Sequence, residues 1–390
     1  MISVSEARTL IHNENEHFRT VKLPLLQANG YVLAEALISP LDTPPFNQSA
    51  MDGYAFAYDS LEHSKELKVK TSIQAGSSFE GSLAPGETAR IFTGAPLPKG
   101  ADTVVMQEKI SRNADKISIE DNAVIKGLNV RLKGSQTARG ETALKQGQLL
   151  TPAAISFLAG LGIFEVTVFD KPKINLLITG DELTPPGQIL EAGQIYESNS
   201  FGLIAALKQM GIEPEYVMYA DDNQIQLNTA IKKGLQVDIL IITGGVSVGD
   251  YDFVTSGLET CGVKTVFHKV KQKPGKPLFF GKKNKTLVFG LPGNPASVMT
   301  CFYEYVQAAI FQFCQLEKSQ DMLYPLTAEY RKKQGLTHFL KGQIHGHNVF
   351  ILPGQESYLM NSYALADCLI EIGEEKTLCE KGELVRVRKL

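Results

Sequence analysis

The chain lacks several features that would mark whole classes of protein. Among its 390 residues there is no apolar run of about eighteen residues, which argues against a membrane-spanning helix. Its 39 Lys and Arg nearly balance its 42 Asp and Glu, so a basic nucleic-acid-binding protein is not indicated. The N-terminal segment carries acidic residues and histidine where a signal peptide would be apolar. We therefore expect a cytoplasmic protein with no membrane and no nucleic-acid partner.

Cysteine is scarce and unpatterned. The five cysteines form an odd set without a Cys-x-x-Cys pair, so neither a disulfide framework nor a structural zinc site is indicated. The seven histidines contain no H-E-x-x-H motif, and no G-x-S-x-G nucleophile elbow is present. Chemistry at this protein would depend on backbone dipoles, a divalent cation and lysines rather than on a covalent intermediate.

What is present is the composition of a globular chain. Hydrophobic residues make up 43% and charged residues 21%, and the length favours two to four domains. Apolar positions at helical spacing over Ala7–Ile11 and Val32–Leu37 predict helices in the first forty or so residues. Thr151 and Pro152 are typical of an N-cap and a first helical position, for a helix ending near Gly160 or Gly162. We expect residues 1–44 and 140–170 to form one discontinuous, helical linking domain.

Two regions are predicted to be rich in strands. Residues 45–139 contain short apolar runs separated by glycine turns, which indicates a β-rich domain inserted into the linking domain. Residues 320–390 show the same texture and predict a small C-terminal β-barrel. The predicted strands are Lys68–Ile73, Thr88–Phe92, Thr103–Met106, Lys116–Ile119, His338–Ile344, Val349–Leu352, Cys368–Ile372 and Leu384–Val387.

Residues 171–319 alternate continuous apolar runs with helix-periodic segments. This pattern predicts a doubly wound, mostly parallel α/β core. The expected strands are Lys173–Thr179, Val237–Ile242 and Thr286–Phe289, and the expected helices are Ser200–Met210 and Ala296–Cys314.

Each of these strands is followed by a polar, glycine-rich loop, at Thr179–Leu183, Thr243–Asp250 and Gly290–Ser297. In open α/β sheets, ligands bind beyond the carboxyl ends of the strands, where glycine lets backbone N–H groups approach an anion. One such loop is as readily an ordinary turn, but three together favour a phosphorylated or nucleotide-like ligand. No Walker A motif exists, because Asp250 stands where the lysine should be, and no G-x-G-x-x-G motif is present.

Carboxylates also fall at or near the predicted strand ends. Because carboxylates repel phosphates unless a cation lies between them, Mg²⁺ is the natural inference. Any single aspartate could instead cap a helix or sit in a solvated turn, and this holds most strongly for Asp250. Asp221 and Asp252 are the better candidates for metal ligands.

A short loop concentrates positive charge in a rigid backbone. The segment Lys271–Pro277, called the lysine loop below, contains three lysines, two prolines and a glycine. Because proline and glycine fix its backbone, Lys273 and Lys276 can be held pointing at one place. Such an arrangement suits an oxyanion, with each lysine acting as a point charge. A solvated basic turn is the alternative.

Six motifs in order resemble those of the molybdopterin molybdenumtransferases, the family of bacterial MoeA and the gephyrin E domain. Any one of them would be a weak signal, but the resemblance runs collinearly through the chain. The motifs are Pro44–Ala55, Phe92–Pro96, Thr179–Leu183, Thr243–Gly249, Lys273–Pro277 and Gly290–Ser297.

The resemblance implies an activity and an assembly. Molybdate would be inserted into the dithiolene of adenylylated molybdopterin, with Mg²⁺, releasing AMP and giving molybdenum cofactor. The resemblance also implies four domains in an elongated homodimer with the site at the subunit interface. A molybdopterin adenylyltransferase would supply the substrate.

The resemblance assigns residues motif by motif. Asp52, Thr93 and Glu182 would be catalytic, the first two reaching the site from the β-rich domain of the partner subunit. Asp221 and Asp252 would hold the metal, and Lys273, Lys276 and Ser297 would bind molybdate. The full set of substrate-binding positions is Gly244, Gly245, Ser247, Gly249, Lys273, Lys276, Pro292, Asn294, Pro295 and Ser297.

The chain departs from the family pattern in two places. Asn129-Val-Arg131 is followed by Gly134-Ser-Gln136 rather than by Gly-Glu-Asp, and Asp367 stands where the family often has Asn. Two alternative functions remain: an adenylyltransferase or pyrophosphatase on the same α/β core, and a scaffold protein. The Asp52 segment and the two flanking β domains favour the transferase, and the acidic and lysine loops favour catalysis over scaffolding.

Overall fold

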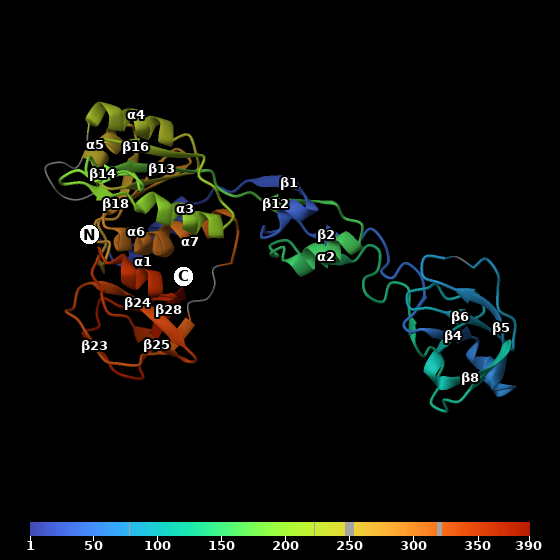
Figure 1. The fold of residues 1–390 in the computed structure, drawn as a ribbon. Coiled ribbons are helices and arrows are strands. Elements are labelled where there is room, and N and C mark those ends of the chain that lie inside the picture. The colour runs from blue at the N-terminus through green and yellow to red at the C-terminus, as the bar shows by residue number, and fades with distance from the viewer. Residues whose placement is uncertain (78, 222, 246–252, 318–321) are drawn as a thin grey trace. The chain divides into compact units, whose positions relative to one another are not determined.

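The computed structural model describes residues 1–77, 79–221, 223–245, 253–317 and 322–390. They form two compact units (Figure 1). The first comprises residues 1–21, 30–32 and 167–390, and the second comprises 22–29 and 33–166. The finer division into four domains stays a prediction.

The first unit is built on a six-stranded sheet in the order β16-β13-β17-β21-β20-β18. The first four strands are mutually parallel, as predicted, whereas β20 pairs antiparallel with both β21 and β18, so the sheet is mixed. A two-residue turn with Asn284 at φ +54° joins β20 to β21, which makes a hairpin and reverses the strand direction. The strands are β16 (Tyr216–Ala220), β13 (Ile174–Thr179), β17 (Ile239–Thr243), β21 (Thr286–Leu291), β20 (Phe279–Lys283) and β18 (Lys264–His268).

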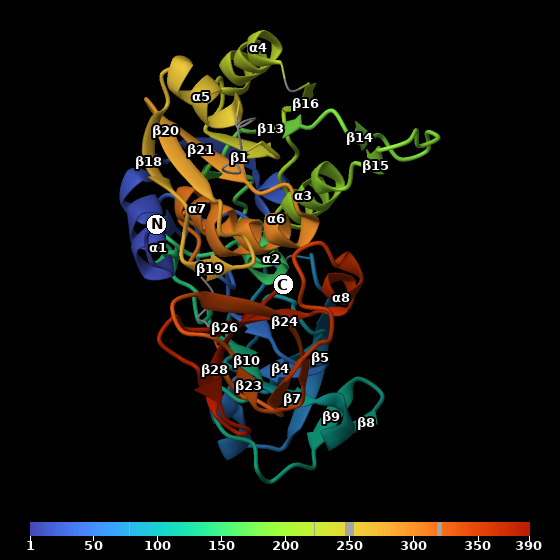
Figure 2. The same cartoon turned by 90° about the vertical axis from the view of Figure 1, so that its left-hand side faces the viewer.

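Helices cover both faces of this sheet, as predicted (Figure 2). Alternate strand residues face opposite sides, so Leu176 and Ile241 pack in one hydrophobic cluster while Leu177 and Ile242 pack in the other. The predicted helix over Ala296–Cys314 is present, but its middle is a π-helix, η4 (Phe302–Val306). One face carries α4 (Gln224–Gly234) and α5 (Phe253–Thr260); the other carries α1 (Val4–Glu14), α3 (Asn199–Gln209), α6 (Pro295–Cys301) and α7 (Gln307–Phe313).

Only the first of the two helices predicted near the N-terminus forms. Helix α1 begins with a reciprocal capping box between Ser3 and Glu6 and packs in the core of the α/β sheet. The helix predicted over Val32–Leu37 is wrong: Leu33 exchanges two backbone hydrogen bonds with residues 147 and 148. Leu37 lies in the short strand β2 (Leu37–Ile38), which pairs with β11 (Thr142–Leu144). Non-local pairing therefore overrides the helical spacing.

The second unit contains a six-stranded sheet in the order β7-β4-β6-β5-β9-β8. Strands β5, β6, β7 and β9 coincide with the predicted ones within two residues, whereas β4 and β8 were not predicted. Helix α2 (Pro152–Gly160) begins directly after the predicted Thr151 N-cap. The sheet strands are β4 (Gly53–Phe56), β5 (Glu66–Ile73), β6 (Glu87–Ile91), β7 (Thr103–Met106), β8 (Ile110–Asn113) and β9 (Lys116–Ile119). Shorter elements are β1 (Thr20–Pro24), η1 (Leu25–Ala28), β3 (Gln48–Ser49), η2 (Tyr58–Glu62), η3 (Gln107–Lys109), β10 (Val130–Arg131) and β12 (Glu165–Phe169).

The C-terminal part of the first unit is strand-rich, as predicted. Its main sheet has the order β19-β24-β26-β28-β22, with β25 paired to β24. An isolated bridge joins Leu326, directly after β22, to Val349 of β25. Strand β19 (Gln272–Lys273) pairs in parallel with β24, so the lysine loop begins on this sheet. The elements are β22 (Met322–Pro325), β23 (Tyr330–Arg331), β24 (Thr337–His345), β25 (Asn348–Ile351), α8 (Met360–Leu365), β26 (Cys368–Ile372), β27 (Leu378–Cys379) and β28 (Leu384–Lys389), with β14 (Leu183–Thr184) and β15 (Ile195–Tyr196) lying between β13 and α3.

The structure bears on membrane-spanning helices and on disulfides. Among the described residues, no helix is long and apolar enough to cross a membrane. All five cysteines are buried and unpaired, so no disulfide forms.

Candidate substrate pocket

A cavity of about 650 Å³ lies at the carboxyl edge of the parallel strands in the first unit. Its walls include Thr179 at the end of β13, Gly244 after β17 and Pro292 after β21. The three glycine-rich loops therefore meet at one place, as expected for strands that run parallel. The lysine loop and residues from loops of the C-terminal part complete the lining.

The loop after β17 passes so close to its neighbours that it requires glycine. Gly244 has φ +86°, and a Cβ placed there would lie 2.3 Å from the carbonyl oxygen of Thr179. Gly245 has φ +58°, and its Cβ would lie 2.6 Å from a methyl carbon of Val254. Side chains are therefore excluded, and the backbone forms this part of the pocket wall. Ser247 and Gly249, predicted in the same loop, lie outside the described residues.

The lysine loop forms another wall. Lys273 and Lys276 both line the pocket with exposed side chains, and among the described residues neither has an ion-pair partner. The peptide bond between Lys273 and Pro274 is cis. Gly275 has φ +84°, and a Cβ there would lie 2.6 Å from Sγ of Cys301. Two uncompensated positive charges on a tightly packed loop suit an anionic ligand.

The loop after β21 supplies Pro292, Asn294, Pro295 and Ser297 to the pocket. Asn294 Nδ2 donates to the Ser357 hydroxyl at 2.9 Å, which links this loop to the loop between β25 and α8. Ser297 is buried to 3% exposure in the first turn of α6. The predicted residues of this loop are therefore brought to the same cavity as the two lysines.

The acidic candidates are placed differently. Glu182 lines the pocket, and Asp221 is an exposed residue directly after β16 that does not line it. Asp252 lies outside the described residues. Carboxylate oxygens are suitable Mg²⁺ ligands, but the described part of the chain gathers no group of three acidic, histidine or cysteine side chains that could hold a metal. The described residues therefore do not make a complete magnesium site.

Asp52 and Thr93 belong to the second unit, where they contact each other. The Thr93 backbone N–H and hydroxyl each donate to Asp52 Oδ1 at 2.8 Å. These two hydrogen bonds lower the pKa of the Asp52 carboxyl, first through the backbone N–H and then through the hydroxyl, with a smaller contribution from the charge of Arg90. Arg90 donates to the Gly53 carbonyl at 2.9 Å and lies over the Phe92 ring, 4.7 Å from its centroid. Asp52 is thus held ionised.

Several pocket residues were not predicted. Leu336, Gln355 and Ser357 come from loops of the C-terminal part, and no motif spacing links them to the loops of the α/β core. Asn199 at the start of α3 donates to the Gly293 carbonyl at 2.9 Å. The polar Glu197–Ser200 segment was a possible signal, since it begins a helix at the ligand-binding edge of the sheet.

Together, the fold and the pocket define a multidomain α/β protein with a candidate ligand pocket at the carboxyl edge of its sheet. Family profiles match almost the whole chain. The MoeA N-terminal region (domain I and II) matches residues 2–162, the probable molybdopterin binding domain matches 175–312, and the MoeA C-terminal region (domain IV) matches 324–390. The chain belongs to the MoeA family of molybdopterin molybdenumtransferases.

Individual relatives support this membership. A protein of Haemophilus influenzae named molybdopterin molybdenumtransferase is 34% identical, over 99% of this chain and 98% of its own length. A Nostoc protein of the same name is 35% identical, over 93% of this chain and 81% of its own. The crystal structure of a molybdopterin biosynthesis MoeA protein from Pyrococcus horikoshii superposes with a TM-score of 0.85 at 30% identity, covering 100% of this chain and 99% of that one. The chain is therefore a member of an enzyme family over its full length.

Proposed function

We propose that this protein inserts molybdate into the dithiolene of adenylylated molybdopterin, releasing AMP and forming molybdenum cofactor. The observation that carries the proposal is the convergence on one cavity of three glycine-rich loops and two lysines that have no ion-pair partner in the described part of the chain. A molybdate dianion and a substrate pyrophosphate are both anions that such a lining suits. The name shared by the curated relatives supports the same reaction.

The proposed division of labour follows from the chemistry of the two substrates. Lys273, Lys276 and Ser297 would bind molybdate, since a tetrahedral oxyanion needs fixed cations and a hydroxyl donor. The exposed backbone at Gly244 and Gly245 would accommodate the pyrophosphate, because no side chain blocks its approach. Pro292, Asn294 and Pro295 would shape the pocket wall formed by the loop after β21. Glu182, an acidic residue that also lines the pocket, would be catalytic. Formation of molybdenum–sulfur bonds then depends mainly on positioning.

We further propose that the reaction uses Mg²⁺, held by Asp221 and Asp252. Mg²⁺ would neutralise the charge of the pyrophosphate. Support comes from the place of Asp221 directly after a parallel strand and from the anionic substrate. Removal of divalent cations should lower activity, and added Mg²⁺ should restore it. Unchanged activity in a chelator, or an Asp252→Ala variant with an unaltered Mg²⁺ titration, would contradict this role.

The proposed assembly is a cytoplasmic homodimer with the site at the subunit interface. Asp52 and Thr93 of the partner subunit would complete the site, and a molybdopterin adenylyltransferase would supply the substrate. The firm pairing of Asp52 with Thr93 supports a shared role for these two residues.

The reaction is tested by identifying its product. The purified protein is incubated with adenylylated molybdopterin, molybdate and Mg²⁺, and the pterin is analysed by mass spectrometry. We expect a pterin monophosphate with molybdenum on its dithiolene. An adenylyltransferase would instead adenylylate molybdopterin when given ATP, a pyrophosphatase would yield metal-free pterin, and a scaffold would leave the substrate unchanged. Any of these three outcomes would overturn the proposal.

A further inference from the structure

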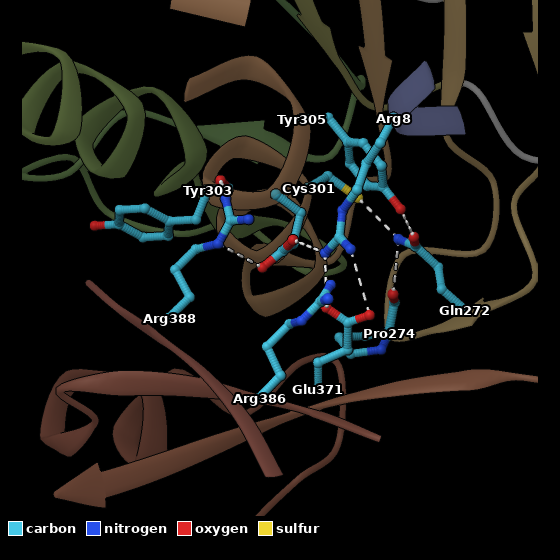
Figure 3. A network of polar contacts seen from close by, with 10 residues as sticks. Arg8, Gln272, Pro274, Cys301, Tyr303, Tyr305, Glu371, Arg386 and Arg388 are labelled. Carbon is cyan, nitrogen blue, oxygen red and sulfur yellow. Dashed lines mark hydrogen bonds and ion pairs between the residues drawn. The ribbon is translucent and has the colours of Figure 1, made fainter. Parts of the chain in front are cut away.

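The side chain of Gln272 donates hydrogen bonds to the backbone of the lysine loop. Gln272 is the residue directly before Lys273 and is only 1% exposed. Its Nε2 donates to the carbonyl oxygen of Pro274 at 3.1 Å (Figure 3) and to that of Gly275, also at 3.1 Å. Within the described chain, neither carbonyl accepts a hydrogen bond from a backbone N–H. One buried amide therefore bridges the Pro274 and Gly275 carbonyls, which belong to two of the peptide groups between the two lysines.

A tyrosine fixes which end of this amide faces the loop. The Tyr305 hydroxyl donates to Oε1 of Gln272, and Tyr305 is fully buried. Burial raises the pKa of Tyr305 well above its ordinary value, so the phenol keeps its proton and remains a donor. Because the amide oxygen accepts from this hydroxyl, the amide nitrogen is directed at the two carbonyls.

The position of Tyr305 depends on the π-helical turn η4. In that turn the neighbouring Glu304, 2% exposed, forms ion pairs with Arg8 of α1 at 2.5 Å and with Arg388 of β28 at 3.1 Å. Figure 3 shows the Tyr305 hydroxyl directed at Gln272. Isolated π-helical turns are frequent at functional sites. Here the turn anchors one residue to α1 and the C-terminal strands and directs the next toward the lysine loop.

We propose that Gln272, oriented by Tyr305, is a positioning residue for molybdate binding: it sets the geometry in which Lys273 and Lys276 meet the anion. This inference rests on the proposed function, in which the two lysines bind molybdate. Lysine side chains are flexible, so the anion is bound tightly only if the backbone that carries them is held in place beforehand. Without the amide, the Pro274 carbonyl loses its donor and the Gly275 carbonyl keeps only the long contact from the Cys301 thiol at 3.8 Å, so the loop shifts to find water.

The test uses Gln272→Met, which keeps the volume but removes both donors, and Tyr305→Phe, which removes only the orienting hydroxyl. Gln312→Met is a matched control, because Gln312 Nε2 also bridges two carbonyls, those of His12 and Asn15, each at 2.9 Å. Gln312 belongs to the same unit and does not line the pocket. Binding of molybdate alone is measured by equilibrium dialysis, and KM and kcat are measured for both substrates. Thermal unfolding of each variant establishes that it is folded.

We expect Gln272→Met to weaken molybdate binding and raise the KM for molybdate about tenfold, the factor that corresponds to the loss of one to two net hydrogen bonds. Tyr305→Phe should have a smaller effect of about threefold. In both variants the KM for adenylylated molybdopterin should change by less than about twofold, and Gln312→Met should leave both constants unchanged.

The outcomes separate the inference from the function on which it rests. If the wild-type protein binds molybdate but Gln272→Met binds it equally well, or loses only thermal stability as Gln312→Met does, Gln272 is merely structural and the inference is overturned. If Gln272→Met does not fold, Tyr305→Phe decides the question by the same comparison. If the wild-type protein neither binds molybdate nor uses it, the proposed function falls first and the inference with it.

Discussion

Thr93 donates two hydrogen bonds to one oxygen of Asp52, from its backbone N–H and from its hydroxyl, each at 2.8 Å. The sheet of the second unit creates this pair, because Gly53 at the start of β4 lies opposite Ile91 at the end of β6. Asp52 and Thr93 therefore leave neighbouring antiparallel strands at the same end. The two motifs that the sequence places forty-one residues apart act as one local structure.

The two hydrogen bonds predict how Asp52 titrates. Thr93→Val keeps the backbone donor but removes the hydroxyl, so the pKa of Asp52 should rise part of the way toward its ordinary value of 3.8. Thr93→Ser keeps both donors and should leave the pKa unchanged. A carbon-13 NMR titration of the carboxyl group measures both. The stabilisation from this pair is present above the ordinary pKa and is lost as pH falls through the lowered one. Equal pKa values in the two variants would contradict the account.

Gly244 should tolerate no side chain. Gly244→Ala combines a left-handed backbone with a Cβ placed 2.3 Å from the Thr179 carbonyl oxygen, and we expect a loss of about 3 kcal/mol or more in the free energy of unfolding. Gly346→Ala is the matched control, since φ there is +60° but no atom lies within 4 Å, and it should cost only about 1 kcal/mol. Chemical denaturation compares the two. Similar losses would show that the close approach to Thr179 does not constrain the loop.

His338 should make the stability of the first unit depend on pH. Burial, then the charges of Lys332 and Lys273, lower the pKa of His338 from 6.5 to about 4. Between these two values the unfolded chain binds more protons than the folded one, so the free energy of unfolding falls as the pH falls, by at most about 1.4 kcal/mol per pH unit. His338→Gln removes this contribution. Denaturation at pH 7 and pH 5 should show a smaller decrease for the variant, and equal decreases would argue against the lowered pKa.

A site shared between subunits predicts complementation. Asp52→Ala and Lys276→Ala should each be nearly inactive alone, because each removes a residue from every site. In subunit-exchanged mixtures, heterodimers would carry one intact site, and activity should recover to about one quarter of wild type for random exchange. Lys285→Ala, an exposed lysine outside the pocket, is the control and should remain active. No recovery in mixtures shown to exchange subunits would contradict the shared site.

The sequence predicted most of the pocket because its residues follow strand ends. The predicted runs Lys173–Thr179, Val237–Ile242 and Thr286–Phe289 lie in three neighbouring strands that pair in parallel, so the loops behind them must meet. The lysine loop was predictable from its prolines and glycine, which restrict the backbone in any context. These signals are local, and in the lysine loop and at the strand ends no contact between distant segments overrides them.

The rest depends on contacts between distant segments. The helix predicted over Val32–Leu37 fails because Leu33 pairs with residues more than a hundred positions away. Gln272 and Tyr305 looked like ordinary residues of a loop and a helix, since nothing in the sequence shows that a π-helical turn brings them together. Strands β20 and β18 were missed for the same reason: their hydrogen bonds, rather than their composition, make them strands.

The central claim is that the pocket couples molybdate insertion to cleavage of the adenylylated substrate. The most direct test is AMP release from adenylylated molybdopterin with Mg²⁺, measured with and without molybdate. The account predicts release that depends on molybdate, which would also show that Ser135-Gln136 substitutes for the acidic pair usual in the family. Tight substrate binding without release, or release at the same rate without molybdate, would contradict it.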